Sequence, residues 1–227
     1  MTFDYLRQSL FFFRNHANRL ALIQLPFLAV LAFVQFQVIQ QLPDNLENIQ
    51  TATLQKSIFL SSALDLALMP VYWGATLFYL QSVLHGQPLA ISRALSLSMT
   101  CWGRLLLTYM LSVLAISFGL VLLIVPGIYI AIRLAFAEFY CVMDGMGPID
   151  ALKASWDKTN DFFWPLLQGM ALLFGCLLLL ETLIGELLRE QQGALTLVSI
   201  LIQFLGVLPT IYAYRLYCVM KADDQPT

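Results

Sequence analysis

Six stretches of mainly apolar residues, each close to 20 residues long, alternate with short polar segments along the chain. None shows the strict alternation of polar and apolar positions that marks the strands of a membrane barrel. A helix needs about 17–25 residues to cross the hydrocarbon layer of a bilayer. The pattern therefore predicts an all-α, polytopic membrane protein. Its six predicted transmembrane helices cover residues 20–40, 58–84, 105–125, 127–143, 164–184 and 194–220.

Composition supports the same class. Hydrophobic residues make up 59% of the 227 residues, charged residues only 11%, and the mean hydropathy is +0.77. A soluble domain carries about a quarter charged residues. The net charge of −2 argues against a broad basic surface, so a nucleic-acid partner is not expected.

The Lys and Arg residues between the spans fall on alternate segments. One side of the predicted membrane has nine: Arg7, Arg14, Arg19, Arg93, Arg104, Lys153, Lys158, Arg215 and Lys221. The other side has only Lys56 and Arg189. Because cytoplasmic loops carry the excess of Lys and Arg, both termini are expected in the cytoplasm. We interpret residues 1–220 as one transmembrane domain and 221–227 as a short cytoplasmic tail.

The odd-numbered spans are preceded by similar segments. Ala94–Ser98 stands before the third span, Ala151–Ser155 before the fifth, and Tyr5–Ser9, a looser copy, before the first. Each is predicted to be a short amphipathic helix on the cytoplasmic side. Such a helix can anchor in the lipid headgroup layer, or it can bind a soluble partner.

The even-numbered spans repeat as well, because each contains a proline followed three residues later by an aromatic ring. The pairs are Pro70 and Trp73, Pro126 and Tyr129, and Pro209 and Tyr212. We predict three parallel helical-hairpin repeats, at about residues 2–86, 89–145 and 148–220, each preceded by a cytoplasmic amphipathic helix.

The prolines should change the shape of their spans. Pro126 with Gly127 fits a tight outer turn, whereas Pro70 and Pro209 lie inside spans and should bend them. A bend can serve packing or act as a gating hinge. Trp73, Tyr129 and Tyr212 either line a shared pocket or belong to the aromatic belt at the membrane surface.

Four ionisable residues are predicted within the spans: Asp65, Arg133, Glu138 and Glu181. Charges at membrane depth are costly, so they are candidates for a structural lock or for a proton or substrate path. Asp65 and Arg133 lie at similar depth, and we expect them to pair. Glu138 needs its own partner, for which Tyr109 and Arg104 are candidates. Glu181 is close enough to the outer end of its span to reach water.

Two small-xxx-small pairs suggest close helix contacts, namely Ala115 with Gly119 and Ala171 with Gly175. The sequence contains no nucleotide-binding, zinc-protease or nucleophile-elbow motif. The four cysteines form no CxxC pair and the two histidines are isolated, so neither a metal site nor a cofactor is expected.

Several short segments resemble the YciC-type family of bacterial inner-membrane proteins. These segments are Phe11–Asn15, Val125–Ile128, and Ala151–Ser155 after Met143–Gly145. They are more distantly similar to the membrane domain of some glycerophosphodiester phosphodiesterases. The resemblance implies a six-span inner-membrane protein without established biochemical activity.

We therefore expect a non-enzymatic, multi-pass protein of the bacterial inner membrane. It would bind lipid or a membrane partner in envelope homeostasis. The alternative is a small transporter or lipid-moving protein with a cavity among the three hairpins. A membrane-embedded enzyme is a third, less favoured interpretation.

Overall fold

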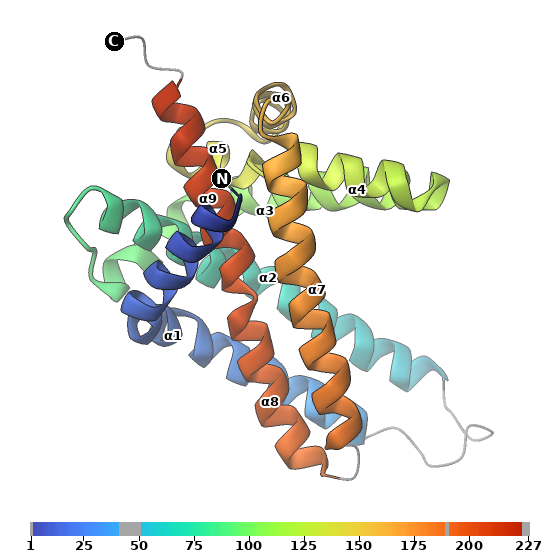
Figure 1. The fold of residues 1–227 in the computed structure, drawn as a ribbon. Coiled ribbons are helices and arrows are strands. Elements are labelled where there is room, and N and C mark those ends of the chain that lie inside the picture. The colour runs from blue at the N-terminus through green and yellow to red at the C-terminus, as the bar shows by residue number, and fades with distance from the viewer. Residues whose placement is uncertain (1, 41–50, 189–190, 224–227) are drawn as a thin grey trace.

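The computed structural model describes residues 2–40, 51–188 and 191–223, and these residues fold into α-helices joined by short connections (Figure 1). The helices are α1 (Thr2–Gln40), α2 (Thr51–Leu84), α3 (Ile91–Leu122), α4 (Ile124–Arg133), α5 (Ala137–Met143), α6 (Pro148–Lys158), α7 (Phe163–Leu187), α8 (Gln192–Leu205) and α9 (Val207–Asp223). Arg189, and the predicted tail beyond Asp223, lie outside the described residues.

Six segments of the described chain are long and apolar enough to cross a membrane, as predicted. They are Thr2–Val38, Gln55–Leu84, Ile91–Leu122, Ile124–Met143, Phe163–Leu187 and Gly193–Asp223. A polytopic, helical membrane protein is therefore confirmed. Figure 1 shows that α4 runs across the direction of α7 and α8.

The predicted separate amphipathic helices are correct only for the third unit, where α6 is a helix of its own. Residues 5–9 and 94–98 are instead early turns of α1 and α3, which continue into the apolar stretches without a break. At about 1.5 Å per residue, the 39 residues of α1 extend about 58 Å, well beyond a hydrocarbon layer of about 30 Å. The first two segments are therefore extensions of their spans.

The fourth and sixth spans are each divided into two helices. The fourth is interrupted at residues 134–136, between α4 and α5, and the sixth at Gly206, between α8 and α9. Pro209 is the third residue of α9, a position where a helix tolerates proline. It lies inside the sixth span as predicted, and the break at Gly206 stands three residues before it. Pro70 does lie inside α2 and is buried.

The turn between α3 and α4 is tighter than predicted and comes earlier. Leu123 alone separates the two helices, with an extended backbone, and Pro126 and Gly127 belong to the first turn of α4. A Cβ on Gly119 would lie 2.9 Å from the Cα of Gly127, so the two glycines allow the helices to touch. The close approach predicted at Gly119 is thus present, whereas nothing lies near Gly175.

The helices contact one another in a cyclic order. The second span, α2, packs along α3, the fourth span packs through α5 on α6, and the sixth packs through α9 on the start of α1. One buried serine lies on the segment that precedes the odd-numbered span of each unit: Ser9, Ser98 and Ser155. Ser98 packs against Gly74 of α2. Ser155 forms hydrogen bonds with the backbone of Arg133 and Phe136 at the break between α4 and α5.

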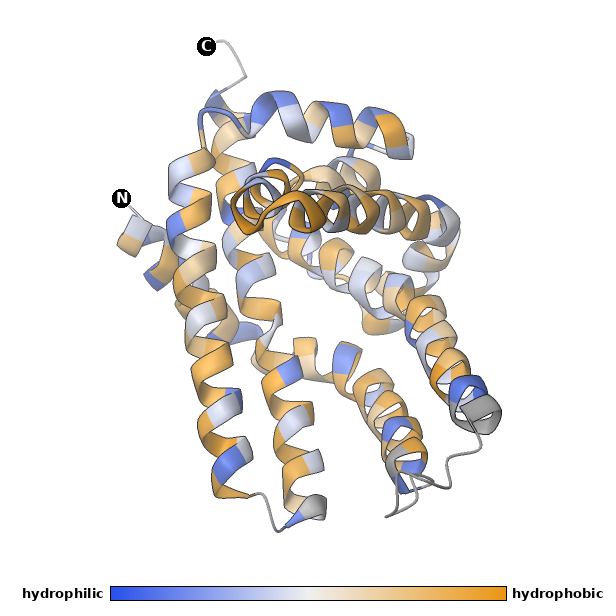
Figure 2. Ribbon diagram, turned by 90° about the vertical axis from the view of Figure 1, so that its right-hand side faces the viewer, coloured by the Kyte–Doolittle hydropathy of each residue, from blue (hydrophilic) through white to orange (hydrophobic). Residues whose placement is uncertain are grey.

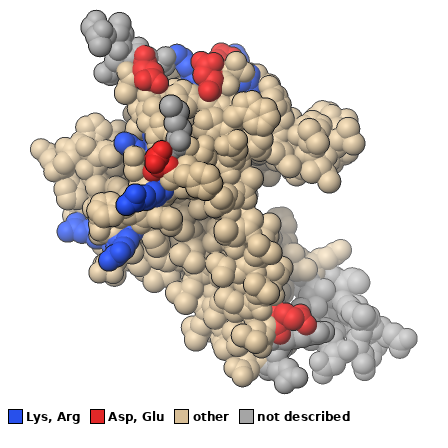
Figure 3. All heavy atoms as spheres, in the orientation of Figure 1, with Lys and Arg blue, Asp and Glu red and all other residues tan. Residues whose placement is uncertain are grey.

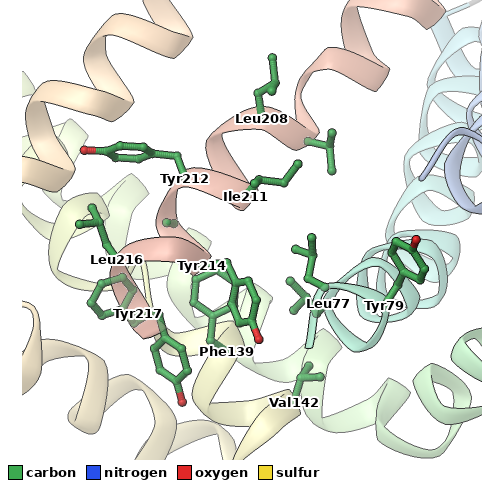
Figure 4. Close-up of a cluster of buried hydrophobic side chains, with 14 of the residues drawn as sticks. Leu77, Tyr79, Phe139, Val142, Leu208, Ile211, Tyr212, Tyr214, Leu216 and Tyr217 are labelled. Carbon is green, nitrogen blue, oxygen red and sulfur yellow. The ribbon is translucent and has the colours of Figure 1, made fainter. Parts of the chain in front are cut away.

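Aromatic rings dominate the core where the second, fourth and sixth spans meet. Figure 4 shows Phe139 of α5 beside Tyr214 and Tyr217 of α9, with Leu77 of α2 nearby. The ring centroids of Phe139 and Tyr217 are 5.4 Å apart. Such large rings bury much apolar surface and fix the three spans to one another.

Polar and charged residues gather at one end of the molecule. The strongly hydrophilic α6 crosses that end, while orange, apolar residues cover most of the diverging helices (Figure 2). Most Lys and Arg side chains visible in Figure 3 lie near the two termini and over the start of α1. There Lys221 forms an ion pair with Asp144 at 2.6 Å, and Arg104 donates to the carbonyl of Gly145.

Candidate functional site: a cavity among the three hairpins

A cavity of about 370 Å³ lies where all three hairpins meet. Trp73 of α2 lines it, together with Tyr109 and Ser112 of α3 and Glu138 of α5. Its remaining wall comes from α4, α7 and the junction of α8 with α9, and is mostly apolar. Helix interfaces and helix breaks are common places for ligand sites in membrane proteins.

Glu138 is the one charged side chain among the described residues that line this cavity. The break at residues 134–136 places it in the first turn of α5, facing α2. Trp73 donates its indole N–H to Oε2 of Glu138 at 2.5 Å. The predicted partners do not hold the carboxylate, because Arg104 bonds Gly145 and Tyr109 forms only another part of the wall.

Ser112 adds a second polar group to the cavity. Its residue is 7% exposed, and its hydroxyl has no hydrogen-bond partner among the described residues. A buried unpaired hydroxyl costs about 1–3 kcal/mol, which a bound polar molecule would recover.

The predicted pair of Asp65 and Arg133 is wrong. Gln35 of α1 donates to Asp65 at 3.4 Å, whereas Arg133 donates to Asn160 at 2.9 Å and lies 4.9 Å from the Trp156 ring. No ion pair joins the two across the described helices, because Arg133 is turned toward α6 at the end of α4. Neither residue lines the cavity.

The other candidates take separate positions. Glu181 is exposed on α7, near its outer end. Tyr129 packs on Trp156 and Phe163 near Arg133, outside the cavity. Tyr212 is fully buried, and its hydroxyl donates to the carbonyl of Pro165 at 2.6 Å. Of the three rings considered for a pocket, only Trp73 lines one.

A second cavity, of about 360 Å³, lies between α1, α2 and α9. Phe11, Phe12 and Leu84 contribute to its apolar wall. His16 bonds the Tyr79 hydroxyl at 3.0 Å, and Arg215 donates to Gln8 at 2.8 Å. The polar groups of His16 and Arg215 thus already have partners, in contrast to Ser112 in the central cavity.

Metal-binding geometry is not present in the described part of the chain. No group of three or more His, Cys, Asp or Glu side chains comes together there. Cys101, Cys141, Cys176 and Cys218 are all free thiols in separate places. The chemistry that the central cavity offers is therefore a carboxylate, the hydroxyl groups of Tyr109, Ser112 and Thr210, and aromatic rings on an apolar wall.

Comparison with known proteins identifies relatives that are themselves uncharacterised. A UPF0259 membrane protein of Sodalis glossinidius is 31% identical over 157 residues, which cover 65% of this chain and 60% of that protein. A relative with the same family name in Photorhabdus laumondii is 27% identical, over 67% of this chain and 60% of the relative. Another in Yersinia pestis is 30% identical, over 65% of this chain and 58% of the relative.

The chain therefore matches about three fifths of the length of these relatives. No solved structure matches it. The resemblance to the YciC-type family agrees with these findings, whereas the one to phosphodiesterase membrane domains stays a prediction. Because residues 32–219 match the uncharacterised protein family UPF0259, the chain belongs to that family, and the relatives named above are membrane proteins.

Proposed function

We propose that this protein is a non-enzymatic, multi-pass component of the bacterial inner membrane that binds membrane lipid in its central cavity and so serves envelope homeostasis. The observation that carries the proposal is the cavity itself, because it combines apolar walls with a small polar patch at membrane depth. A lipid or another amphipathic molecule has the matching combination of groups. Other membrane proteins are further possible partners of the exposed helices.

The proposed orientation places both termini in the cytoplasm and the three hairpin turns outside. The charged end of the molecule, with α6 and the Lys221–Asp144 pair, supports this orientation through the positive-inside rule. We also propose that the three hairpins are parallel repeats. The cyclic packing of α2 on α3, α5 on α6 and α9 on α1 supports this relation.

Topology reporters test the orientation. A periplasmic reporter such as alkaline phosphatase, fused after Gln40 or after Gln192, is expected to be active. Fusion after Lys158 or Asp223 is expected to give an inactive phosphatase, because these positions follow cytoplasmic segments. The matched fluorescent-protein fusions should show the opposite pattern. An active phosphatase after Lys158 would contradict the proposed orientation.

Filling the cavity tests lipid binding. Ala135 lies on its wall at the break between α4 and α5, so Ala135→Phe should occupy part of the space. We expect the variant to retain fewer lipids than the wild type when both are purified in dodecyl maltoside and analysed by native mass spectrometry. Ala171→Phe is the matched control, because Ala171 is exposed on α7 and does not line the cavity. Equal lipid retention in all three proteins would contradict the proposal.

A lipid-moving protein is the second candidate, and one observation favours it. The two helix breaks, at residues 134–136 and at Gly206, both border the cavity, and broken helices are a common feature of transport sites. The same variants separate the two functions in proteoliposomes that contain a fluorescent lipid. Static binding predicts no transfer between leaflets, whereas movement predicts a transfer rate that Ala135→Phe lowers and Ala171→Phe does not.

A further inference from the structure

The charge of Glu138 has no opposite charge beside it in the cavity. Among the described residues lining the cavity there is no Lys, Arg or His. The nearby cations have other partners, since Arg104 bonds the Gly145 carbonyl and Arg133 bonds Asn160. An ionised carboxylate at membrane depth is costly unless a positive group accompanies it, and without one the carboxyl group takes up a proton. The cavity is therefore electrostatically suited to a cation.

The groups around the carboxylate fit a cation that also donates hydrogen bonds. Trp73 occupies Oε2 of Glu138, which leaves Oε1 open to another donor. Tyr109 and Phe139 contribute rings to the same cavity, and the faces of aromatic rings attract ammonium groups. The buried hydroxyl of Ser112 can accept a further N–H, and it has no partner among the described residues.

The rest of the wall suits an alkyl chain. Val113 and Ile116 of α3 and Met170 and Phe174 of α7 also line the cavity, and all four are apolar. A volume of about 370 Å³ lies at the small end of the range of about 300–1,000 Å³ for ligand sites. This space fits a small polar head and the first part of a chain.

We infer that the cavity selects amphipathic molecules that carry an ammonium group, with Glu138 as the counter-charge and Ser112 as a second contact. This inference rests on the proposed function, because it requires that the cavity holds a ligand. Both a phosphatidylethanolamine headgroup and a free long-chain amine carry this chemistry.

The test compares two probes with the same chain, dodecylammonium and dodecanol, on the full-length protein in uncharged dodecyl maltoside micelles. Binding is measured by native mass spectrometry over a titration of each probe. Glu138→Gln keeps the size of the side chain and an acceptor for Trp73. We expect it to weaken dodecylammonium binding about tenfold or more, because a charge-assisted contact is lost, and to change dodecanol binding by less than about twofold.

Glu181→Gln is the matched control, since Glu181 is an exposed carboxylate on α7, and it should leave both affinities unchanged. Equal weakening of both probes by Glu138→Gln, or no weakening of either, overturns the inference while the cavity remains a binding site. If the wild type binds neither probe, the proposed function itself fails. If Glu138→Gln does not fold, the affinities of the wild type for dodecylammonium and dodecanol are compared after correction for micelle partition. Equal affinities for the two probes overturn the inference.

Extraction of the co-purified lipids distinguishes the two sources of the ammonium group. Enrichment of phosphatidylethanolamine over phosphatidylglycerol in the wild type, lost in Glu138→Gln, assigns the cavity to a membrane lipid. Dodecylammonium binding without such enrichment assigns it to a free amphiphile. Both results support the shared chemistry of the inference.

Discussion

Gly169→Leu is expected to lower the free energy of unfolding by about 3 kcal/mol. Gly169 is buried on the face of α7 that meets α9, and a Cβ there would overlap with the ring of Tyr212. That ring cannot easily yield, because it is fully buried and its hydroxyl is bonded to the Pro165 carbonyl at 2.6 Å. Overpacking costs about 1–3 kcal/mol, and the hydrogen bond adds about 1 kcal/mol.

Gly175→Leu is the control, because it lies on the same helix and nothing stands within 4 Å of its added Cβ. Leucine also favours a helix more than glycine does, by somewhat less than about 1 kcal/mol. We therefore expect this variant to be as stable as the wild type, or slightly more stable, in thermal unfolding in dodecyl maltoside. Equal losses at both positions would mean that α7 and α9 do not pack through Gly169 and Tyr212.

Ser155→Ala is expected to destabilise the protein by about 2 kcal/mol. The Ser155 hydroxyl accepts a hydrogen bond from the Phe136 N–H at 3.1 Å and donates to the Arg133 carbonyl at 2.8 Å. The Phe136 N–H and the Arg133 carbonyl lie at the break between α4 and α5, where the helical hydrogen-bond pattern is interrupted. Alanine would leave the Phe136 N–H buried without an acceptor, which costs about 1–3 kcal/mol, while Thr159 still bonds the Arg133 carbonyl.

Ser96→Ala provides the comparison, because Ser96 is an exposed serine on α3. Its replacement should shift the unfolding midpoint by no more than the small gain expected from the helix propensity of alanine. Hydrogen exchange at Phe136 gives an independent measurement, since its amide should exchange faster in Ser155→Ala alone. An unchanged exchange rate would show that another group satisfies this amide.

The spans were predictable from the sequence because the bilayer constrains them strongly. Any segment that crosses it must be apolar and helical, and that signal is local. The breaks that divide the fourth and the sixth span into two helices each were not predictable in the same way. Pro209 predicted a bend in the sixth span, and the break at Gly206 lies three residues before it. Residues 134–136, in contrast, contain neither proline nor glycine. Ser155 of α6 and Thr159, which follows α6, both bond the Arg133 carbonyl at that break, so it is a tertiary effect.

The candidate site was predictable only in parts. Glu138 stood out as an ionisable residue in a span, and Trp73 as a ring at a fixed distance from a proline. Their hydrogen bond was missed because it depends on how α2 and α5 are rotated toward each other, which no local pattern specifies. Ser112 carried no signal, since a serine in an apolar helix is common and only the fold shows that its hydroxyl is unpaired.

The contact between α1 and α9 has a consequence for biogenesis. The chain is synthesised from its N-terminus, so α1 leaves the ribosome before α9. Until α9 is inserted, the early turns of α1 lack the partner that holds Gln8 through Arg215. The contact between α1 and α9 can therefore form only after α9 has been synthesised.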